Sequence, residues 1–248
     1  HYAYKGKYIF DATLRRDGST KFGKNNRWGV FPSVSVGWKF SNMSFLRDQS
    51  WLSLGKLRVG WGLLGNNRID ELARYTYLNS GYNYPYGVGN HSVWEGSAAM
   101  VLGNDDIKWE KSESFNVGVD LSFLRNRLML TVEYFNRKTT DMLLRVPTVL
   151  SAGLDANGAP MTNAGAVKNY GFEYDVKWRD NIGKHFRYEV GFNLSWIKNE
   201  VTSLGTGNEP IWGNTVALSL NDPVTKTVVG QPVGAFFGYV TDGIFQTY

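Results

Sequence analysis

The chain has 248 residues, no cysteine and a formal net charge of +5, and aromatic residues make up 15% of it. The lack of cysteine excludes disulfides, a thiol nucleophile and cysteine-ligated metals. Basic residues are interspersed with acidic ones rather than grouped, which argues against nucleic-acid binding. No apolar run approaches the ~20 residues that a membrane helix needs, so any membrane-spanning structure must be made of strands.

Seven segments alternate apolar and polar side chains, which is the period of a strand with two different faces. Pro32 falls inside the second segment, where it should interrupt pairing or mark an edge or bulge. A short helical turn is expected in the linker 41–54, and a short strand near 224–229. The seven predicted strands, in chain order, are Tyr4–Arg16, Trp28–Phe40, Lys56–Leu64, Ser114–Phe123, Leu128–Arg137, Tyr170–Arg179 and Phe186–Lys198.

The two faces of these predicted strands differ sharply, because one is aliphatic or aromatic and the other carries full charges. A soluble sandwich would bury the apolar face against a second sheet, whereas a transmembrane barrel turns it to lipid and keeps the charges in a wet lumen. The predicted lipid-facing residues are Phe115, Val119, Phe172, Tyr174, Phe192 and Leu194. The predicted lumen-facing residues are Asp120, Glu173, Asp175, Arg187 and Glu189.

Tight and long connections alternate between the later strands. Short turns follow Phe123 and Arg179, whereas long Gly- and Asn-rich segments occupy 66–112, 143–168 and 200–230. Outer-membrane barrels have short periplasmic turns and long extracellular loops, and each predicted strand has the ~10 residues needed to cross a bilayer at a tilt. The sequence therefore predicts an all-β fold whose antiparallel strands form part of a transmembrane barrel with long extracellular loops.

Residues that could carry chemistry are few. His1, His91 and His185 lie in unrelated segments without metal-ligand spacing, so we predict no metal site. Asp105 and Asp106 suggest a pair of catalytic carboxylates, but adjacent acids on one loop point apart, whereas a glycosidase needs carboxyl groups that converge. A solvated acidic turn is the simpler interpretation. We expect no enzyme activity and no cofactor.

Aromatic side chains crowd the predicted loops. Tyr84, Tyr86 and Trp94 lie in mid-segment among glycine and asparagine, away from the strand ends where membrane-interface aromatics belong, and Trp212 lies in the last loop. Rings with polar tips suit stacking on sugars or other flat ligands. These four residues are the candidate substrate-binding set. The alternative is that they fold the long loop onto itself or onto a neighbouring domain.

A series of short motifs runs through nearly the whole chain. In order, they are Leu14-Arg15-Arg16-Asp17-Gly18-Ser19, Phe22-Gly23, Asn26-Arg27-Trp28-Gly29, Phe31-Pro32-Ser33, Leu57-Arg58-Val59-Gly60-Trp61-Gly62, Gly65-Asn66, Trp109-Glu110-Lys111-Ser112, Asn126-Arg127-Leu128, Thr140-Asp141, Asn163-Ala164-Gly165, Lys198-Asn199, Gly230-Gln231-Pro232, Phe237-Gly238-Tyr239 and Gly243-Ile244-Phe245. Each is weak alone. In this order and spacing they resemble the SusC/RagA family of TonB-dependent outer-membrane transporters.

The resemblance implies a 22-stranded barrel whose lumen holds a plug domain. It also implies a SusD-like surface lipoprotein that closes over the mouth, and TonB as the energy source acting through an N-terminal region. Bacteroidetes use such pairs to import oligosaccharides or peptides. The plug, the TonB box and the closing strands would lie outside this sequence, so residues 1–248 are expected to be a partial barrel domain of an importer in the bacterial outer membrane.

Two other interpretations stay open from the sequence. One is a TonB-dependent siderophore or cobalamin receptor that works without a lipoprotein lid. The other is a soluble carbohydrate-binding β-sandwich or a cell-wall structural protein. Detergent dependence would separate the sandwich from both transporters, and co-purification of a lipoprotein would separate the first transporter from the second.

Overall fold

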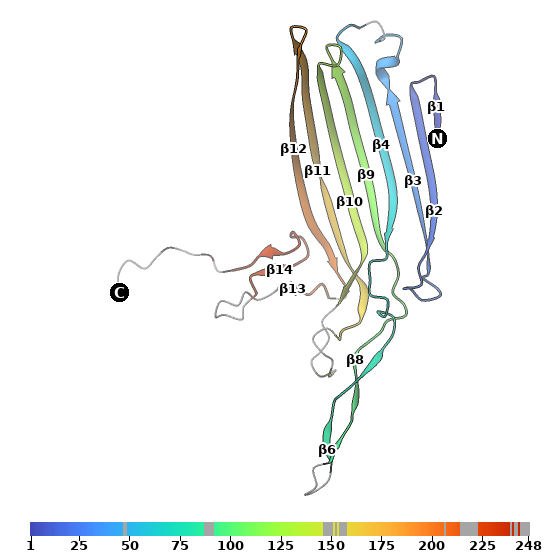
Figure 1. Ribbon diagram of the computed structural model, residues 1–248, viewed down its shortest axis with the longest axis vertical. Helices are drawn as coiled ribbons and strands as arrows, with labels where there is room; N and C mark the ends of the chain where they lie inside the picture. The colour runs from blue at the N-terminus through green and yellow to red at the C-terminus, as the bar shows by residue number, and fades with distance from the viewer. Residues whose placement is uncertain are drawn as a thin grey trace.

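The computed structural model describes residues 1–46, 49–86, 92–145, 151, 153, 158–205, 207–213, 223–238, 240 and 243. Its main body is an eight-stranded antiparallel sheet in the order β1-β2-β3-β4-β9-β10-β11-β12 (Figure 1). This meander confirms the predicted all-β antiparallel fold class. The strands are β1 (Tyr2–Tyr4), β2 (Tyr8–Gly18), β3 (Trp28–Lys39), β4 (Leu52–Asn66), β9 (Glu110–Phe123), β10 (Leu128–Arg145), β11 (Met161–Ile182) and β12 (Phe186–Leu204).

Two smaller parts leave the main sheet. Between β4 and β9 an arm is built from β5 (Tyr77–Ser80) paired with β8 (Ser97–Val101) and β6 (Tyr84–Tyr86) paired with β7 (Ser92–Trp94). After β12, a three-stranded sheet contains β13 (Ile211–Trp212), β14 (Thr225–Thr227) and β15 (Ala235–Phe236). The short strand expected near 224–229 is β14, and the expected helical turn is η1 (Phe40–Asn42). No helix in the described part of the chain is long and apolar enough to cross a membrane.

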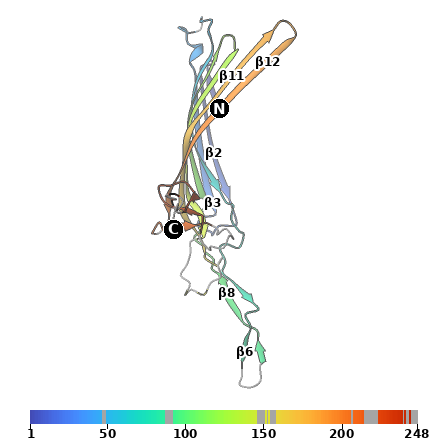
Figure 2. The same cartoon turned by 90° about the vertical axis from the view of Figure 1, so that its left-hand side faces the viewer.

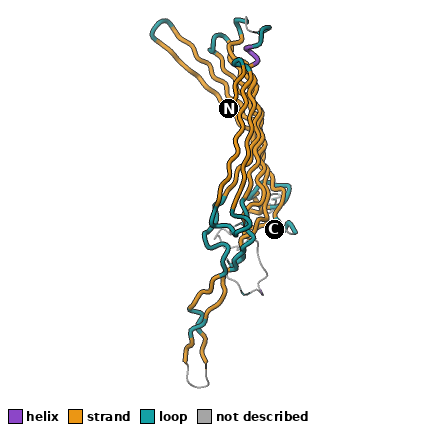
Figure 3. The backbone as a smooth tube through the Cα atoms, turned by 90° about the vertical axis from the view of Figure 1, so that its right-hand side faces the viewer, coloured by secondary structure: helices purple, strands orange, loops and turns teal. Residues whose placement is uncertain are grey.

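The strand register separates the apolar and charged sets as predicted. Val132 on β10 pairs with Val119 and Tyr174, whereas the preceding Thr131 pairs with Asp120 and therefore points to the other face. Seen from the side, the strands of the main sheet form a single layer (Figure 3), and no second sheet among the described residues covers its apolar face. The sandwich interpretation is wrong for this part of the chain, because a sandwich would bury these rings between two sheets.

The strands extend further toward the long loops than the sequence pattern suggested. β10 continues past Arg137 to Arg145, and β11 begins at Met161 rather than at Tyr170. The physical reason is that ladder hydrogen bonds join backbones, so pairing continues where the apolar alternation has ended. The long segments predicted as loops are correspondingly shorter.

The first predicted strand, 4–16, is confirmed from residue 8 onward as part of β2 but is wrong at its start. Lys5 and Gly6 adopt left-handed φ angles of 48° and 61°, so the chain turns there and β1 folds back on the start of β2. Pro32 behaves as predicted. β3 pairs with β2 along 28–38, but its ladder to β4 begins only at Ser33, because proline has no N–H to offer.

Short turns gather at one end of the sheet and long connections at the other (Figure 1, Figure 2). The turns 124–127 and 183–185 lie at the first end, together with the longer linker that contains η1. The arm and the three-stranded sheet lie at the second end, called the loop end below. The alternation of tight and long connections in the sequence is therefore a difference between two ends of one sheet.

Most of the buried apolar side chains lie at the loop end rather than along the sheet. The Phe31 ring crosses two backbones there, since a Cβ at Gly29 or Gly65 would come within 2.4 or 2.0 Å of Phe31 Cζ. Glycine is therefore required at both positions. A second, smaller cluster contains Val167, Val201 and Leu204. The larger cluster, called the loop-end cluster below, is formed by Phe22, Phe31, Ile69, Ile107 and Trp109.

Candidate functional site: the charged face and the loop end

The five residues predicted to face the lumen lie on one face of the sheet, opposite the apolar rings. That this face lines a barrel lumen stays a prediction. The five residues are Asp120, Glu173, Asp175, Arg187 and Glu189. Near the short-turn end, Arg179 donates two hydrogen bonds to Glu189 Oε2, from Nε at 2.7 Å and from Nη2 at 2.5 Å. Arg187 Nε donates to Asn181 Oδ1 at 3.2 Å. The face is thus polar and cross-linked between strands.

Arg58 of β4 organises a group of charges on this face that the sequence pattern did not reveal. Its Nη2 lies 2.6 Å from Glu133 Oε2 on β10, and its Nε lies 3.3 Å from Asp120 Oδ2 on β9. To reach β10 the side chain crosses β9 at Gly118, where a Cβ would lie 2.7 Å from Arg58 Cζ. Asn116 Nδ2 donates to Glu133 Oε1 at 2.7 Å. Only the register, which pairs Gly118 with both Arg58 and Glu133, could have revealed this bridge.

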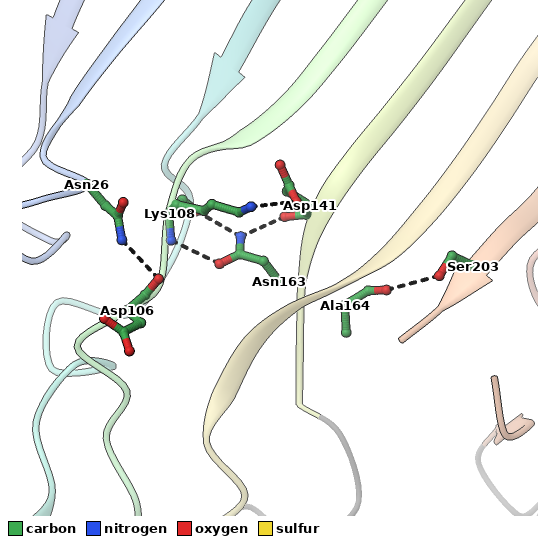
Figure 4. Close-up of polar contacts among 7 residues, drawn as sticks. All are labelled: Asn26, Asp106, Lys108, Asp141, Asn163, Ala164 and Ser203. Atoms are coloured by element: carbon green, nitrogen blue, oxygen red, sulfur yellow. Dashed lines mark hydrogen bonds and ion pairs between the residues drawn. The ribbon is translucent and has the colours of Figure 1, made fainter. Parts of the chain in front are cut away.

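A polar lock joins the base of the arm to β10 and β11 (Figure 4). Asn163 Nδ2 donates to the carbonyls of Lys108 and Asp141 at 2.9 and 2.8 Å, and Asn163 Oδ1 accepts from the Lys108 N–H at 2.9 Å. Lys108 Nζ lies 3.1 Å from Asp141 Oδ1. Beside this lock, Asn26 Nδ2 donates to the Asp106 carbonyl at 3.0 Å. The residues just before β9 are therefore held to two other strands by side-chain contacts.

The arm brings three of the four candidate ligand residues together. Tyr84 pairs with Trp94 across the β6–β7 hairpin, and Tyr86 meets the Trp94 ring edge-on with centroids 6.2 Å apart. Tyr84, Tyr86 and Trp94 nevertheless remain 52%, 66% and 57% exposed. The arm extends beyond the loop end, away from the main sheet (Figure 1, Figure 2). Self-packing of the loop therefore leaves most of this aromatic surface open.

Trp212 belongs to a different part of the molecule. It lies on β13, its ring meets Phe237 edge-on at 5.2 Å between centroids, and Lys226 Nζ lies 4.6 Å from the Phe237 ring centre. Trp212 is 51% exposed. The candidate set is thus divided between the arm and the three-stranded sheet, which are separate sheets (Figure 1).

The described residues contain no group of three or more His, Cys, Asp or Glu side chains that could hold a metal ion. His1 Nδ1 lies 2.5 Å from Asp11 Oδ1, His185 lies at the β11–β12 turn, and His91 lies outside the described residues. Asp105 is engaged by Arg74, whose Nε donates to Asp105 Oδ1 at 2.8 Å.

Known proteins are similar to this chain in sequence and in fold. Residues 1–241 match the family described as TonB dependent receptor-like, beta-barrel. The chain is 33% identical over 247 residues to "TonB-dependent receptor SusC" of Bacteroides thetaiotaomicron, an alignment that covers 96% of this chain and 24% of the relative. It is 33% identical over 245 residues to "TonB-dependent receptor P39" of Formosa agariphila, covering 99% of this chain and 22% of that one.

A solved structure described as the RagAB peptide transporter matches with a TM-score of 0.78 and 26% identity, over 95% of this chain and 24% of that chain. The same importer in its "open-open" state matches with a TM-score of 0.76 at 26% identity, over 93% of this chain and 23% of that chain. This chain spans about a quarter of the length of these relatives.

Proposed function

Because the chain belongs to the TonB-dependent receptor β-barrel family of the outer membrane, as a receptor of SusC/RagA type, we propose that it forms part of an active importer. The observation that carries the proposal is the 33% sequence identity to SusC over 96% of this chain. The fold similarity to RagAB, with a TM-score of 0.78, supports it. In this proposal the apolar face contacts lipid and the charged face lines the lumen. The ligand is moved across the membrane and undergoes no chemistry.

We further propose that the importer captures an oligosaccharide or a peptide together with a SusD-like lipoprotein lid, and that TonB supplies the energy. Two features support capture at the loop end. The described arm residues 75–86 and 92–102 include a single charged side chain, Glu95, and their aromatic rings are exposed. Tyrosine- and tryptophan-rich surfaces of this kind bind partners at a low entropic cost. A siderophore or cobalamin receptor without a lid is the alternative, and co-purification of a lipoprotein with the intact transporter separates the two.

The proposal places the loop end outside the cell. The native chain lacks cysteine, so single cysteines report topology without background from this region. We expect a membrane-impermeant maleimide to label Ser80→Cys on the arm in intact cells. Lys184→Cys, in the short turn before β12, should be labelled only after the outer membrane is disrupted. The opposite pattern would invert the proposed orientation.

The aromatic face of the arm should matter for binding and not for barrel assembly. One stacked ring contributes about 1 kcal/mol, so Trp94→Ala should weaken capture several-fold, and replacing Tyr84, Tyr86 and Trp94 together by alanine should weaken it by more than tenfold. The measurement combines binding to the purified transporter–lid complex with growth on the limiting nutrient. Heat-modified migration on gels would check that the barrel has assembled.

Val93→Ala is the matched control for the arm. Val93 is 67% exposed and lies next to Trp94 on the same strand, so its side chain leaves the opposite face of the hairpin. We expect it to bind and grow like the parent. If the triple alanine variant also behaves like the parent, the rings only stabilise the arm.

A further inference from the structure

The apolar face changes character near the loop end, where aromatic side chains form two neighbouring cross-strand rows. One row contains Trp61, Phe115 and Tyr170, and the next contains Tyr134, Phe172 and Trp196. Such rings gather where the apolar core of a membrane meets its headgroups. Two residues further along each strand, about 7 Å, the same face carries a charged row. It consists of Glu113, Lys138, Lys168 and Glu200.

Two lysines of this row oppose each other directly, because Lys138 on β10 pairs with Lys168 on β11. Like charges at directly opposed positions destabilise strand pairing. Within the described part of the chain, neither ammonium group lies within ion-pair distance of a carboxylate. The neighbouring Glu113 instead accepts a hydrogen bond from Trp61 Nε1 at 2.8 Å, and Lys168 Nζ lies 4.7 Å from the Tyr170 ring centre. On its other side in the row, Lys138 pairs with Glu113 and Lys168 with Glu200, so the two adjacent ammonium groups lie between two carboxylates at headgroup level.

The lysines border a hollow of about 320 Å³, and its lining also includes Asn136, whose side chain has an unsatisfied polar atom. Asn136 Oδ1 is buried and has no hydrogen-bond partner among the described residues. A buried acceptor without a donor is costly, so the site favours a ligand that brings one. The hollow is lined by Glu113, Phe115, Asn136, Lys138, Lys168 and Thr202.

We propose that this hollow binds the phosphorylated sugar headgroup of a lipid in the surrounding leaflet. A phosphate between Lys138 and Lys168 replaces their repulsion with two charge-assisted hydrogen bonds. A sugar hydroxyl donates to Asn136 Oδ1, and Glu113 and Thr202 accept from further hydroxyls. A ligand that carries only negative charge suits this mixed lining less well. The inference rests on the outer-membrane location and goes beyond import.

The test uses the full transporter, delipidated in detergent and titrated with lipid A as the phosphorylated glycolipid, with bound lipid read by native mass spectrometry. Each lysine near an anionic headgroup is expected to change affinity about five-fold, so Lys138→Gln/Lys168→Gln should bind roughly 25-fold more weakly. The charge-preserving pair Lys138→Arg/Lys168→Arg should retain most of the affinity. Lys5→Gln/Lys184→Gln removes the same charge from turns at the opposite end and should bind like the parent.

Thermal unfolding supplies a second readout, which compares the unfolding midpoints of the parent and the double glutamine variant with and without lipid. Without lipid, the double glutamine variant should unfold close to the parent, because it loses the Lys138–Lys168 repulsion together with the attraction of each lysine to its paired glutamate. Added lipid A should raise the midpoint of the parent and leave that of the variant unchanged. Equal lipid A binding by parent and variant would overturn the proposal. So would equally tight binding of dephosphorylated lipid A or of phosphatidylglycerol, or displacement of lipid A by inorganic phosphate at similar concentration.

Discussion

Replacing Trp109 by alanine is expected to lower the free energy of unfolding by about 3–5 kcal/mol, the range for removing a large buried aromatic side chain. Trp109 is 7% exposed, and its ring centroid lies 5.1 Å from that of Phe22 and 5.4 Å from that of Phe31. Its indole N–H also donates to the Arg27 carbonyl at 3.3 Å. The variant therefore leaves a cavity at the loop end and removes one of the two hydrogen bonds that the Arg27 carbonyl accepts, the other coming from the Ser19 N–H at 3.0 Å. Urea unfolding of the full barrel in lipid vesicles, followed by fluorescence, measures the loss.

Trp212→Ala is the matched control for this prediction, because it removes the same side chain from an exposed position. It should cost about 0.5 kcal/mol, as expected for a surface substitution. An equally small effect of Trp109→Ala would mean that the loop-end cluster contributes little to the stability of the barrel. The cluster would then only fix the conformation of the loops.

Val132→Arg should destabilise the barrel by about 2–4 kcal/mol, the cost of an arginine on the lipid face near the bilayer midplane. Val132 lies four residues from the short-turn end of β10, between Val119 and Tyr174 on the apolar face. An arginine there has no acidic neighbour in its cross-strand row and must displace lipid. The measurement is the same vesicle unfolding experiment.

Thr131→Arg tests the sidedness at nearly the same depth on the same strand. Thr131 lies between Asp120 and Asp175 on the charged face, so an arginine there gains two carboxylate neighbours. We expect a change within about 0.5 kcal/mol of the parent. If Thr131→Arg were as destabilising as Val132→Arg, the two faces would not contact different surroundings, lipid on one side and water on the other. The assignment of the apolar face to lipid would then fail.

The sequence by itself determined the strands, the difference between their faces, and the family. Along β11, the alternation of Phe172, Glu173, Tyr174 and Asp175 is a property of the strand period, which every extended backbone shares. For that reason local pattern was enough to predict sidedness. The ordered motifs likewise predicted the family, which the comparison with SusC and RagAB confirms.

Strand ends and the turn at Lys5 could not be predicted in the same way. The ladder beyond Arg137 depends on backbone groups that are alike in every residue type, so no side-chain pattern marks where it stops. Lys5 resembles any residue of an alternating strand, and only its left-handed φ beside Gly6 shows the turn.

Tertiary structure alone decided which distant residues act together. The sequence indicated that Tyr84, Trp94 and Trp212 are loop aromatics, but hairpin pairing joins the first two and leaves Trp212 on another sheet. Register likewise places Gly118 under the Arg58 side chain and sets Lys138 against Lys168. The physical reason is that a strand specifies its own faces locally, whereas its neighbours and their alignment arise only when backbones pair across the sheet.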